Sequence, residues 1–229
     1  MFIENFINFI DRAYHQRRIL NFLQKYSIKT IIDVGSHKGE FISYVLKIPS
    51  ISAIYAFEPQ KNIFNILKNK YIKNKKVHPY CLALDSLSRS KKIRINKLTM
   101  TSTLSDLNDS SFYFKFKSIL LNQKNSIINE YKIKTKTLDQ FFKNIKLSKD
   151  ILLKIDTEGY EFNVLKGSLK NIKNFKYILI ENQFSNMYKY SKFSNCEKIL
   201  KRYNFKLIKK FIFPTFHFED RFYIQCAKN

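Results

Sequence analysis

Apolar residues alternate along the chain between short continuous runs and stretches in which they recur every three or four residues. The runs are rich in Ile, Val, Leu and Tyr, which is typical of buried strands, whereas the spaced stretches are typical of amphipathic helices. Strands that alternate with helices indicate an α/β fold, in which helices cover both faces of a mostly parallel sheet. The predicted strands lie at residues 30–34, 54–58, 77–84, 92–98, 131–135, 150–155, 177–182, 205–213 and 221–227, and the predicted helices at residues 39–47, 59–71, 137–142, 162–169 and 194–203. The last two strands are close enough in sequence to pair as an antiparallel hairpin.

The N-terminal residues 2–26 carry apolar side chains at helical spacing, which predicts one or two amphipathic helices. Such a helix can lie on a membrane surface or cover one edge of the sheet. Glu4 and Asp11 leave it only a weakly basic polar face, which favours the sheet edge. We therefore expect residues 1–26 to be a helical extension of a single domain that spans residues 27–229.

A polar and aromatic segment without clear periodicity fills residues 99–130. An insertion at this place in an α/β sheet usually builds the substrate side, because ligand-binding loops gather at the carboxyl ends of the strands. The hydroxyl-rich residues 101–103 either contact an acceptor or form a solvated turn. No motif in this segment names the acceptor.

The junction between the first strand and its helix contains two glycines, Gly35 and Gly39. Gly35 allows the chain to turn tightly off the strand, and Gly39 allows the first helical turn to pack closely or to admit a ligand against bare backbone. The next strand ends in an acid, Glu58, which lies 19 residues beyond Gly39. In nucleotide-binding α/β domains an acid at this place accepts hydrogen bonds from both ribose hydroxyls. Together these features predict a cofactor that contains a ribose.

The residues of the glycine loop distinguish between two such cofactors. The pyrophosphate of NAD prefers the motif G-x-G-x-x-G, which this loop lacks because Ser36 is not glycine. Asp33 sits just before the turn and would repel a pyrophosphate, whereas it would attract the sulfonium and amino groups of S-adenosylmethionine. The loop therefore predicts an S-adenosylmethionine site.

The composition leaves a nucleic-acid partner open without favouring it. The chain has 42 Lys and Arg against 18 Asp and Glu, a net charge of +24, which normally points to nucleic acid or another anionic surface. The lysines are nevertheless spread through every segment together with many Asn and Ile, as an AT-rich coding bias would produce. At 229 residues and 45% hydrophobic, the chain is long enough for one α/β domain with a full core.

Neither the cysteines nor the N-terminus indicates an oxidising or membrane location. Cys81, Cys196 and Cys226 stand far apart with no C-x-x-C pair, so neither a zinc site nor a disulfide framework is predicted. Charged residues interrupt the apolar N-terminus, no small-residue cleavage site follows, and no run reaches the roughly 18 apolar residues of a membrane span. We expect a cytoplasmic protein without a transmembrane segment.

Five motifs follow one another in an order that is found in one enzyme family. They are residues 33–39, Phe57-Glu58-Pro59, Ala83-Leu84, Thr137-Leu138-Asp139 and residues 154–159, K-I-D-T-E-G. With them the chain resembles the FkbM-type family of S-adenosylmethionine-dependent methyltransferases over roughly residues 28–185. The most specific signal is the pairing of F-E-P with K-I-D-x-E-G, and one departure is His37, where many relatives carry asparagine.

The resemblance implies a fold, a reaction and a class of partner. The fold would be a Rossmann-like class I methyltransferase sandwich of three layers, with a seven-stranded, mostly parallel sheet whose last strand runs antiparallel. The reaction would transfer a methyl group to a hydroxyl of a sugar, glycan or secondary metabolite. The partner would accordingly be a small-molecule or glycan acceptor.

The resemblance also implies which residues bind the cofactor. The methionine end falls to Asp33, Gly35 and Gly39, and the ribose to Glu58. The tip of the third strand, near Asp85, would lie beside the adenine. The further cofactor-binding candidates are Ser36, His37, Pro59, Ala83 and Leu84. A purely structural role, as a cap of the following helix, stays open for Asp33.

Asp156 and Glu158 would face the transferring methyl group and the acceptor as catalytic residues. An alcohol is a poor nucleophile until its proton leaves, so one of the two is the predicted general base, with His37 a weaker candidate. Structural alternatives are that Asp156 pairs with a lysine and that Glu158 begins the next helix. A magnesium or calcium ion between Asp156 and Glu181 is a further alternative, although the positions of these acids are explained without a metal.

Two other functions stay open. A nucleic-acid methyltransferase would account for the charge of +24 and for the many Tyr and Phe residues. Against it, the fourth core strand ends in D-T-E-G instead of the N-P-P-Y or D-P-P-Y tip that grips an extruded base. The other is a non-catalytic binding module that keeps the pocket as a relic, and retention of Asp33 and Glu58 argues against it. The oligomeric state is open too, because the apolar N-terminal helix serves a dimer as well as a sheet edge.

Overall fold

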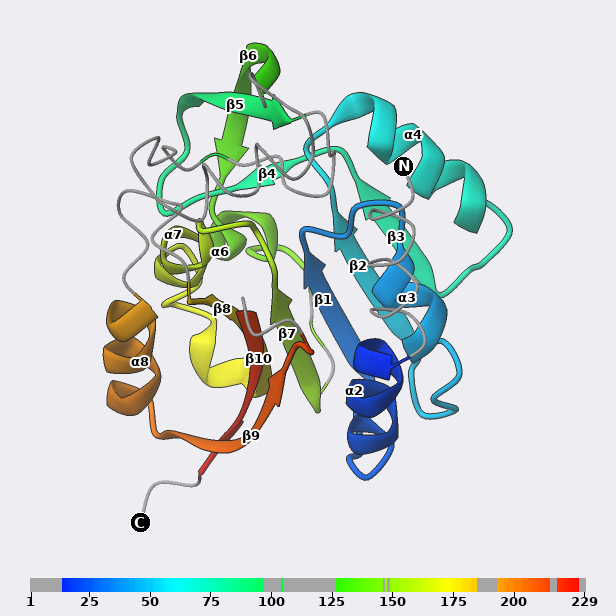
Figure 1. The fold of residues 1–229 in the computed structure, drawn as a ribbon, viewed down its shortest axis with the longest axis vertical. Helices are drawn as coiled ribbons and strands as arrows, with labels where there is room; N and C mark the ends of the chain where they lie inside the picture. Colours follow the sequence, from blue (N-terminus) through cyan, green and yellow to red (C-terminus); the bar gives the residue numbers. More distant parts are fainter. Residues whose placement is uncertain are drawn as a thin grey trace.

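A seven-stranded sheet forms the centre of the computed structural model, in the order β3-β2-β1-β7-β8-β10-β9 (Figure 1). The structure describes residues 14–96, 104, 127–145, 147, 149–184, 193–214 and 218–226. The strands β3, β2, β1, β7 and β8 run parallel, whereas β10 runs antiparallel to both β8 and β9. This topology confirms the expected Rossmann-like α/β fold, with a mostly parallel sheet and an antiparallel last strand.

Most of the expected elements are present, with boundaries that differ by a few residues. The strands of the main sheet are β1 Thr30–Val34, β2 Ala53–Phe57, β3 Val77–Tyr80, β7 Ile151–Ile155, β8 Phe175–Gln183, β9 Phe205–Ile212 and β10 Phe218–Gln225. The helices are α2 Gln16–Leu23, α3 Glu40–Val45, α4 Lys61–Tyr71, α6 Leu138–Phe141, α7 Glu161–Lys166 and α8 Phe193–Arg202, with a short 3-10 turn at Ile172–Asn174. The expected final hairpin is confirmed by the antiparallel pairing of β9 and β10.

Helices cover both faces of the sheet, and each face has its own apolar core (Figure 1). On one face, α2, α3 and α4 bury residues such as Leu23 and Leu67 completely. On the other face, α6, α7 and α8 bury residues such as Leu138 and Leu200 completely. β1 and β7 are buried along their whole length, as expected for parallel strands covered on both sides. These three layers hold the strand tips of the sheet rigidly in register.

The N-terminal helix α2 packs on a face of the sheet and not only along its edge. It buries Ile19, Leu20 and Leu23 in the same apolar core as α3. It also reaches the edge strand β9, because the rings of Phe22 and Phe211 lie 5.3 Å apart. The expectation that this helix covers an edge is therefore too narrow, since the face offers more apolar surface to bury.

The prediction of one strand at residues 77–84 is wrong, because this segment forms two strands in two different sheets. β3 continues the main sheet beside β2, whereas β4, Ala83–Leu84, pairs in parallel with β6. A tight turn separates them, in which the Leu82 amide donates to the Tyr80 carbonyl at 3.0 Å. The second sheet has the order β4-β6-β5, with β5 at Ser90–Asn96 and β6 at Ile127–Lys136.

Parts of the expected organisation lie outside the described residues. These are residues 1–13 of the N-terminal extension and, within the insertion at 99–130, residues 99–103 and 105–126. The hydroxyl-rich residues 101–103 belong to this set. The division into an extension, a domain and a substrate-side insertion stays a prediction.

Candidate active site

The tips of β1 and β7 touch at Gly35. A Cβ atom on Gly35 would lie 1.7 Å from the carbonyl oxygen of Asp156, and the φ angle of Gly35 is +84°. The Asp156 amide in turn donates to the carbonyl of Val34 at 3.0 Å. Only glycine accepts both the positive φ angle and this close approach. Gly35 therefore joins the strand end that carries Asp33 to the strand end that carries Asp156.

Gly39 joins the same loop to helix α4. Its φ angle is +75°, and an added Cβ atom would lie 2.5 Å from the ring of Tyr71. The Tyr71 hydroxyl donates to the carbonyl of Gly39 at 2.7 Å. The structure thus shows a packing reason for this glycine, and contact with a cofactor stays a prediction.

Glu58 is a buried carboxylate at the end of β2, with 3% of its surface exposed. It accepts hydrogen bonds from the backbone amides of His37 at 3.1 Å and Gln60 at 2.7 Å. Burial raises the pKa of Glu58 to about 7, although these amides favour the ionised form. A carboxylate offers about four acceptor positions, so Glu58 has capacity for hydroxyl donors in addition to the two amides.

Ser36 and His37 fix the shape of the loop. The Ser36 hydroxyl donates to the backbone carbonyl of Asp33 at 2.8 Å. The His37 ring nitrogen Nδ1 lies 3.0 Å from Oε1 of Glu40, whose other oxygen accepts from the Lys38 amide. Burial opposes ionisation of Glu40, but the hydrogen bond and charge of His37 lower its pKa overall. These contacts support the interpretation that His37 orients the loop.

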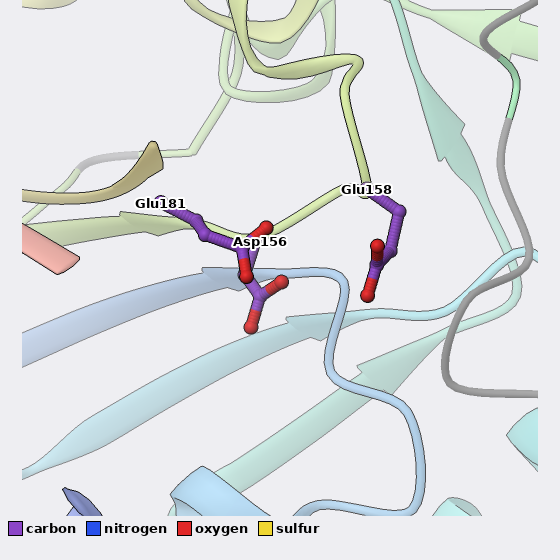
Figure 2. Close-up of side chains that lie close together, drawn as sticks. All are labelled: Asp156, Glu158 and Glu181. Atoms are coloured by element: carbon purple, nitrogen blue, oxygen red, sulfur yellow. The ribbon is translucent and has the colours of Figure 1, made fainter. Parts of the chain in front are cut away.

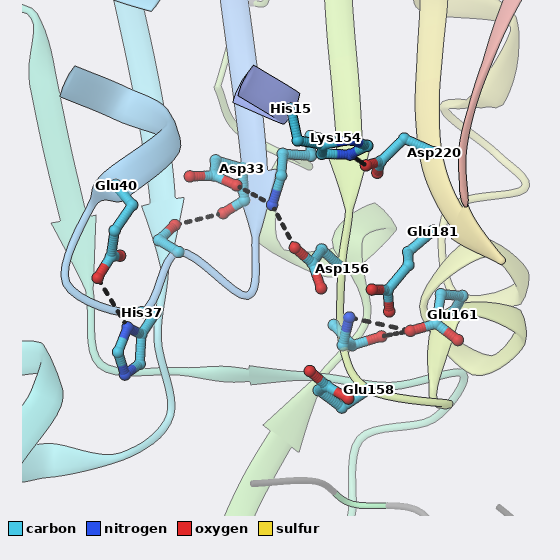
Figure 3. Close-up of polar contacts among 12 residues, drawn as sticks. His15, Asp33, His37, Glu40, Lys154, Asp156, Glu158, Glu161, Glu181 and Asp220 are labelled. Carbon is cyan, nitrogen blue, oxygen red and sulfur yellow. Dashed lines mark hydrogen bonds and ion pairs between the residues drawn. The ribbon is translucent and has the colours of Figure 1, made fainter. Parts of the chain in front are cut away.

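Lys154 on β7 is a buried cation between two carboxylates (Figure 3). Its Nζ atom lies 3.2 Å from Oδ1 of Asp33 and 3.1 Å from Oδ2 of Asp156. Burial opposes its charge, but the neighbouring carboxylates Asp156, Asp33 and Asp220 raise the pKa of Lys154. The structure therefore confirms the contact of Asp156 with a lysine, which the sequence left open.

Asp33 is fully buried, and its Oδ2 atom has no hydrogen-bond donor among the described residues. A buried carboxylate oxygen without a donor is unfavourable, so a cationic group that arrives at this strand tip would be stabilised. Lys154 already balances part of this negative charge. The attraction predicted from the sequence therefore applies only to the part of the Asp33 charge that Lys154 leaves unbalanced.

Three acids gather where β7 and β8 end. Asp156, Glu158 and Glu181 each place a carboxylate oxygen within 4.8 Å of the others (Figure 2). Glu181 is 5% exposed, whereas the side chain of Asp156 is 36% exposed. Gln183 donates to Glu158 at 2.7 Å and to Glu181 at 3.1 Å. The expected proximity of Asp156 and Glu181 is confirmed, and carboxylate oxygens at this spacing suit a hard divalent cation.

Burial raises the pKa of two acids in this cluster, Asp156 and Glu181. For Asp156 the main cause is burial, and the charge of Asp220 adds to it while Lys154 opposes it. For Glu181 burial also dominates, followed by the negative charges of Asp156 and Glu158. A carboxylate with a raised pKa is a stronger base than an ordinary one.

Glu161, in the first turn of α7, organises the loop between β7 and that helix. Its buried Oε1 atom accepts from the amides of Thr157 at 2.9 Å and Gly159 at 3.0 Å, and from the Thr157 hydroxyl at 3.1 Å. Burial raises the pKa of Glu161 to about 7. The loop carries Glu158 at a φ angle of +53°, so Glu161 stabilises a backbone conformation that is unusual for glutamate.

The candidates for the adenine side lie mainly in the protein interior. Ala83 and Leu84 are each 3% exposed and pack in the apolar core on the α6–α8 face. Asp85 is fully buried, where it accepts from the Tyr160 hydroxyl at 2.7 Å and from Arg89 at 2.8 Å. The structure thus gives these residues packing and ion-pair roles, and their contact with adenine stays a prediction. Pro59 is partly buried between Glu58 and helix α4.

Two residues that shape the site were not assigned a role from the sequence. Lys154 stands two positions before Asp156, and residues two apart on a strand share a face, so the ion pair had a readable signal. Glu161 directly follows the motif K-I-D-T-E-G-Y, as an acid in the first turn of a helix. An acid at that position suits the helix dipole, which does not indicate that it binds the preceding loop.

A family model identifies the family of this chain. The model described as the methyltransferase FkbM domain matches residues 33–207, which include both strand tips and the acids described above. The chain belongs to the FkbM methyltransferase family. This confirms the resemblance seen in the sequence, and with it an S-adenosylmethionine-dependent methyltransferase.

Solved structures with the same fold have very different sequences. A SAM-dependent methyltransferase from Aquifex aeolicus matches with a TM-score of 0.50 at 12% identity, over 95% of this chain and 93% of that one. TrmK from M. capricolum, solved with S-adenosyl-homocysteine, matches with a TM-score of 0.52 at 12% identity, over 91% and 68%. The fibrillarin pre-rRNA processing protein from Methanococcus jannaschii matches with a TM-score of 0.50 at 17% identity, over 88% and 68%. At these identities the matches establish the fold.

None of the curated proteins matches this chain. Within the described ranges, every helix is too short or too polar to cross a bilayer.

Proposed function

We propose that this protein transfers the methyl group of S-adenosylmethionine to a hydroxyl of a sugar, glycan or secondary metabolite. The observation that supports this most is the position of Asp156. It is a partly exposed carboxylate with a raised pKa, at the strand tip that touches the glycine loop. A base in this place can receive the proton of an alcohol beside the bound methyl donor.

The cofactor side is formed by the loop after β1 and by the end of β2. Glu58 would accept hydrogen bonds from the two ribose hydroxyls, since its carboxylate is already oriented by two backbone amides. Asp33, with its unpaired Oδ2 atom, would attract the amino group at the methionine end. Gly35 keeps side-chain atoms away from the junction of the two strand tips.

The reaction itself is an in-line displacement, in which the bound cofactor supplies an electrophilic methyl group. The protein contributes mainly by holding the acceptor oxygen about 3 Å from the methyl carbon. Asp156 or Glu158 would take the proton of the hydroxyl, and the raised pKa of Asp156 favours Asp156 in this role. Lys154 would keep Asp156 in place through the 3.1 Å contact.

Replacement of Asp156 by Asn tests this assignment. The amide keeps the shape of the side chain but cannot accept the proton, so turnover should fall on the order of 100-fold or more. Affinity for S-adenosylhomocysteine should stay within about threefold of the wild type, since Asn still accepts a hydrogen bond from Lys154. Methylation assays with a panel of hydroxylated glycans and metabolites, together with calorimetry, measure both quantities. Unchanged turnover would remove Asp156 from the chemistry.

A nucleic-acid acceptor is the second candidate, and the outer face of the β5–β6 ribbon favours it. Lys92, Lys132, Lys134 and Lys136 are all exposed on this ribbon. Two of the structures with the same fold are TrmK and a pre-rRNA processing protein. If nucleic acid is the acceptor, polynucleotide affinity should fall steeply as salt rises from 50 to 200 mM, by about 10³-fold or more for six or more phosphate contacts. Weak binding without this dependence would leave the hydroxyl acceptor as the sole candidate.

A divalent cation at Asp156, Glu158 and Glu181 is a variant of the same mechanism. The three carboxylates are close enough to bind Mg²⁺ or Ca²⁺, which would orient the acceptor oxygen. Treatment with EDTA followed by methylation assays with and without added Mg²⁺ separates the two versions. Full activity after chelation would exclude the metal-assisted one.

A further inference from the structure

Four polar side chains in and beside the candidate site lie on one face of the sheet. Asp33 and Lys154 are cross-strand partners on β1 and β7, and Glu181 and Asp220 are partners on β8 and β10. Cross-strand partners point to the same face of a sheet. This is the face that α2 and α3 cover, because the residues two positions away on each of these strands belong to the apolar core of that face. The carboxylates in this row exceed the cations, so the row carries excess negative charge.

His15, the residue directly before helix α2, closes this row. The ring is fully buried, and its Nε2 atom lies 2.7 Å from Oδ2 of Asp220 (Figure 3). The rings of Phe213 and Phe218 contact His15 edge-on, with centroids 5.3 and 5.4 Å away. The other ring nitrogen, Nδ1, has no hydrogen-bond partner in the part of the chain that the structure describes. A ring held in this way has one polar contact to make, and that contact is with Asp220.

The charge of Asp220 affects three ionisable groups of the candidate site. It is 6% exposed, and its charge contributes to the raised pKa of Lys154, Asp156 and Glu181. A buried carboxylate without a partner is unfavourable, and Lys154 is a nearby cation whose pKa the charge of Asp220 already raises. The hydrogen bond from His15 satisfies Asp220 separately.

His15 and Asp220 both lie outside residues 33–207, the segment that matches the family model. They are 205 positions apart in the chain and meet only through the packing of α2 beside β10. Two side chains that contact each other beside the site therefore come from outside the matched segment.

We propose that His15 is a positioning residue of the methyl-transfer site, which holds Asp220 and so leaves Lys154 to Asp33 and Asp156. The inference rests on the proposed function, because its consequence is that Asp33 is correctly placed to bind the cofactor. It extends that function by assigning a role to the helix that precedes the family domain.

The test compares two replacements of His15 by titration with S-adenosylhomocysteine. His15→Phe keeps a ring between Phe213 and Phe218 but removes the donor to Asp220, and should weaken the affinity about 10-fold. His15→Gln keeps an N–H donor at about the place of Nε2 and should stay within about threefold of the wild type. His78→Phe, which alters an exposed histidine on β3, is the matched control and should change nothing.

A second substitution separates positioning from packing. Addition of Asp220→Asn to His15→Phe removes the unpaired charge, so the double variant should regain an affinity within about threefold of the wild type. A packing defect at His15 would not be rescued in this way. If His15→Phe alone does not fold, the double variant must fold for the proposal to stand.

The outcomes distinguish this inference from the function beneath it. Equal affinity of the wild type and His15→Phe, or a loss that Asp220→Asn does not reverse, would overturn the role of His15 while leaving the methyltransferase intact. Absence of binding in the wild type itself would instead overturn the proposed function, and the inference with it.

Discussion

The two halves of the candidate site differ in what holds Glu58 on one side and Asp156 and Glu158 on the other. On the proposed cofactor side, Glu58 is held by two backbone amides. One belongs to His37 in the glycine loop and the other to Gln60, two residues after Glu58. On the proposed acceptor side, the side chain of Lys154 holds Asp156 and the side chain of Gln183 holds Glu158, and other carboxylates lie close by. Backbone donors are fixed by the course of the chain, whereas side-chain partners depend on strands that meet only after folding. The first half therefore takes its shape from the backbone, whereas the second depends on a balance of charges.

The largest effect that separates the halves is expected for Lys154→Met. The variant leaves the buried Asp33 and the neighbouring Asp156 without their cation, and loss of one member of a buried ion pair destabilises a protein by about 3–5 kcal/mol. Chemical unfolding measures this change. Lys176→Met removes a 47% exposed lysine that pairs with Asp150, and this control should lose less than about 1 kcal/mol. Similar losses in both variants would show that the charge balance of the acceptor side is unimportant.

A smaller loss is expected for Gly35→Ala, which acts where the two halves meet. The new Cβ atom would overlap the carbonyl of Asp156 and occupy a positive φ angle, so we expect a destabilisation of about 2–4 kcal/mol and loss of cofactor binding. Gly39→Ala also occupies a positive φ angle, but its Cβ atom would meet side-chain atoms of Tyr71 and Leu67 instead of backbone, so it should lose less, about 1–2 kcal/mol. Unfolding of the two variants side by side checks this order, and the reverse order would contradict the strand-tip contact.

The smallest effect concerns pH and compares Glu58 with Glu161. Burial raises the pKa of each to about 7 from an ordinary value of 4.5, so the folded state binds more protons between these values. The contribution of each carboxyl group to the free energy of unfolding therefore falls as pH rises from about 4.5 to 7, by at most about 3 kcal/mol.

Unfolding at pH 5 and pH 7.5 measures that difference. Glu58→Gln and Glu161→Gln should each reduce it, because the amide does not titrate. Saturating S-adenosylhomocysteine should reduce the Glu58 contribution alone, since ribose hydroxyls would favour the ionised carboxylate. An equal effect of the ligand on both groups would show that the two halves are not distinct.

The part of the site that could be predicted from sequence is the part built from local pattern. The apolar runs before Asp33 and Asp156 indicated buried strands, and the glycine at position 35 indicated the tight turn. The turn at residues 81–82 could not be anticipated in the same way, because the residues on both sides of it favour strands. It moves Ala83 and Leu84 into a second sheet.

The contacts between distant segments could not be predicted. His15 meets Asp220 only because α2 packs beside β10, and neither residue stands in a motif. The role of Glu161 depends on the positive φ angles of its loop, which no periodicity indicates. Sequence patterns thus located the strand tips, and the packing of the three layers determined which charges meet there.

In the proposed function, the loop after β1 and the acid after β2 form a working S-adenosylmethionine pocket. Calorimetric titration with S-adenosylhomocysteine tests it most directly, with Glu58→Ala as the test variant and Glu197→Ala as the control, since Glu197 is 47% exposed and pairs with Arg221. We predict one-to-one binding that Glu58→Ala weakens by about 10-fold or more and that Glu197→Ala leaves unchanged. Absence of binding in the wild type would mean that the pocket is a relic of the fold, and equal binding by Glu58→Ala would mean that the cofactor lies elsewhere.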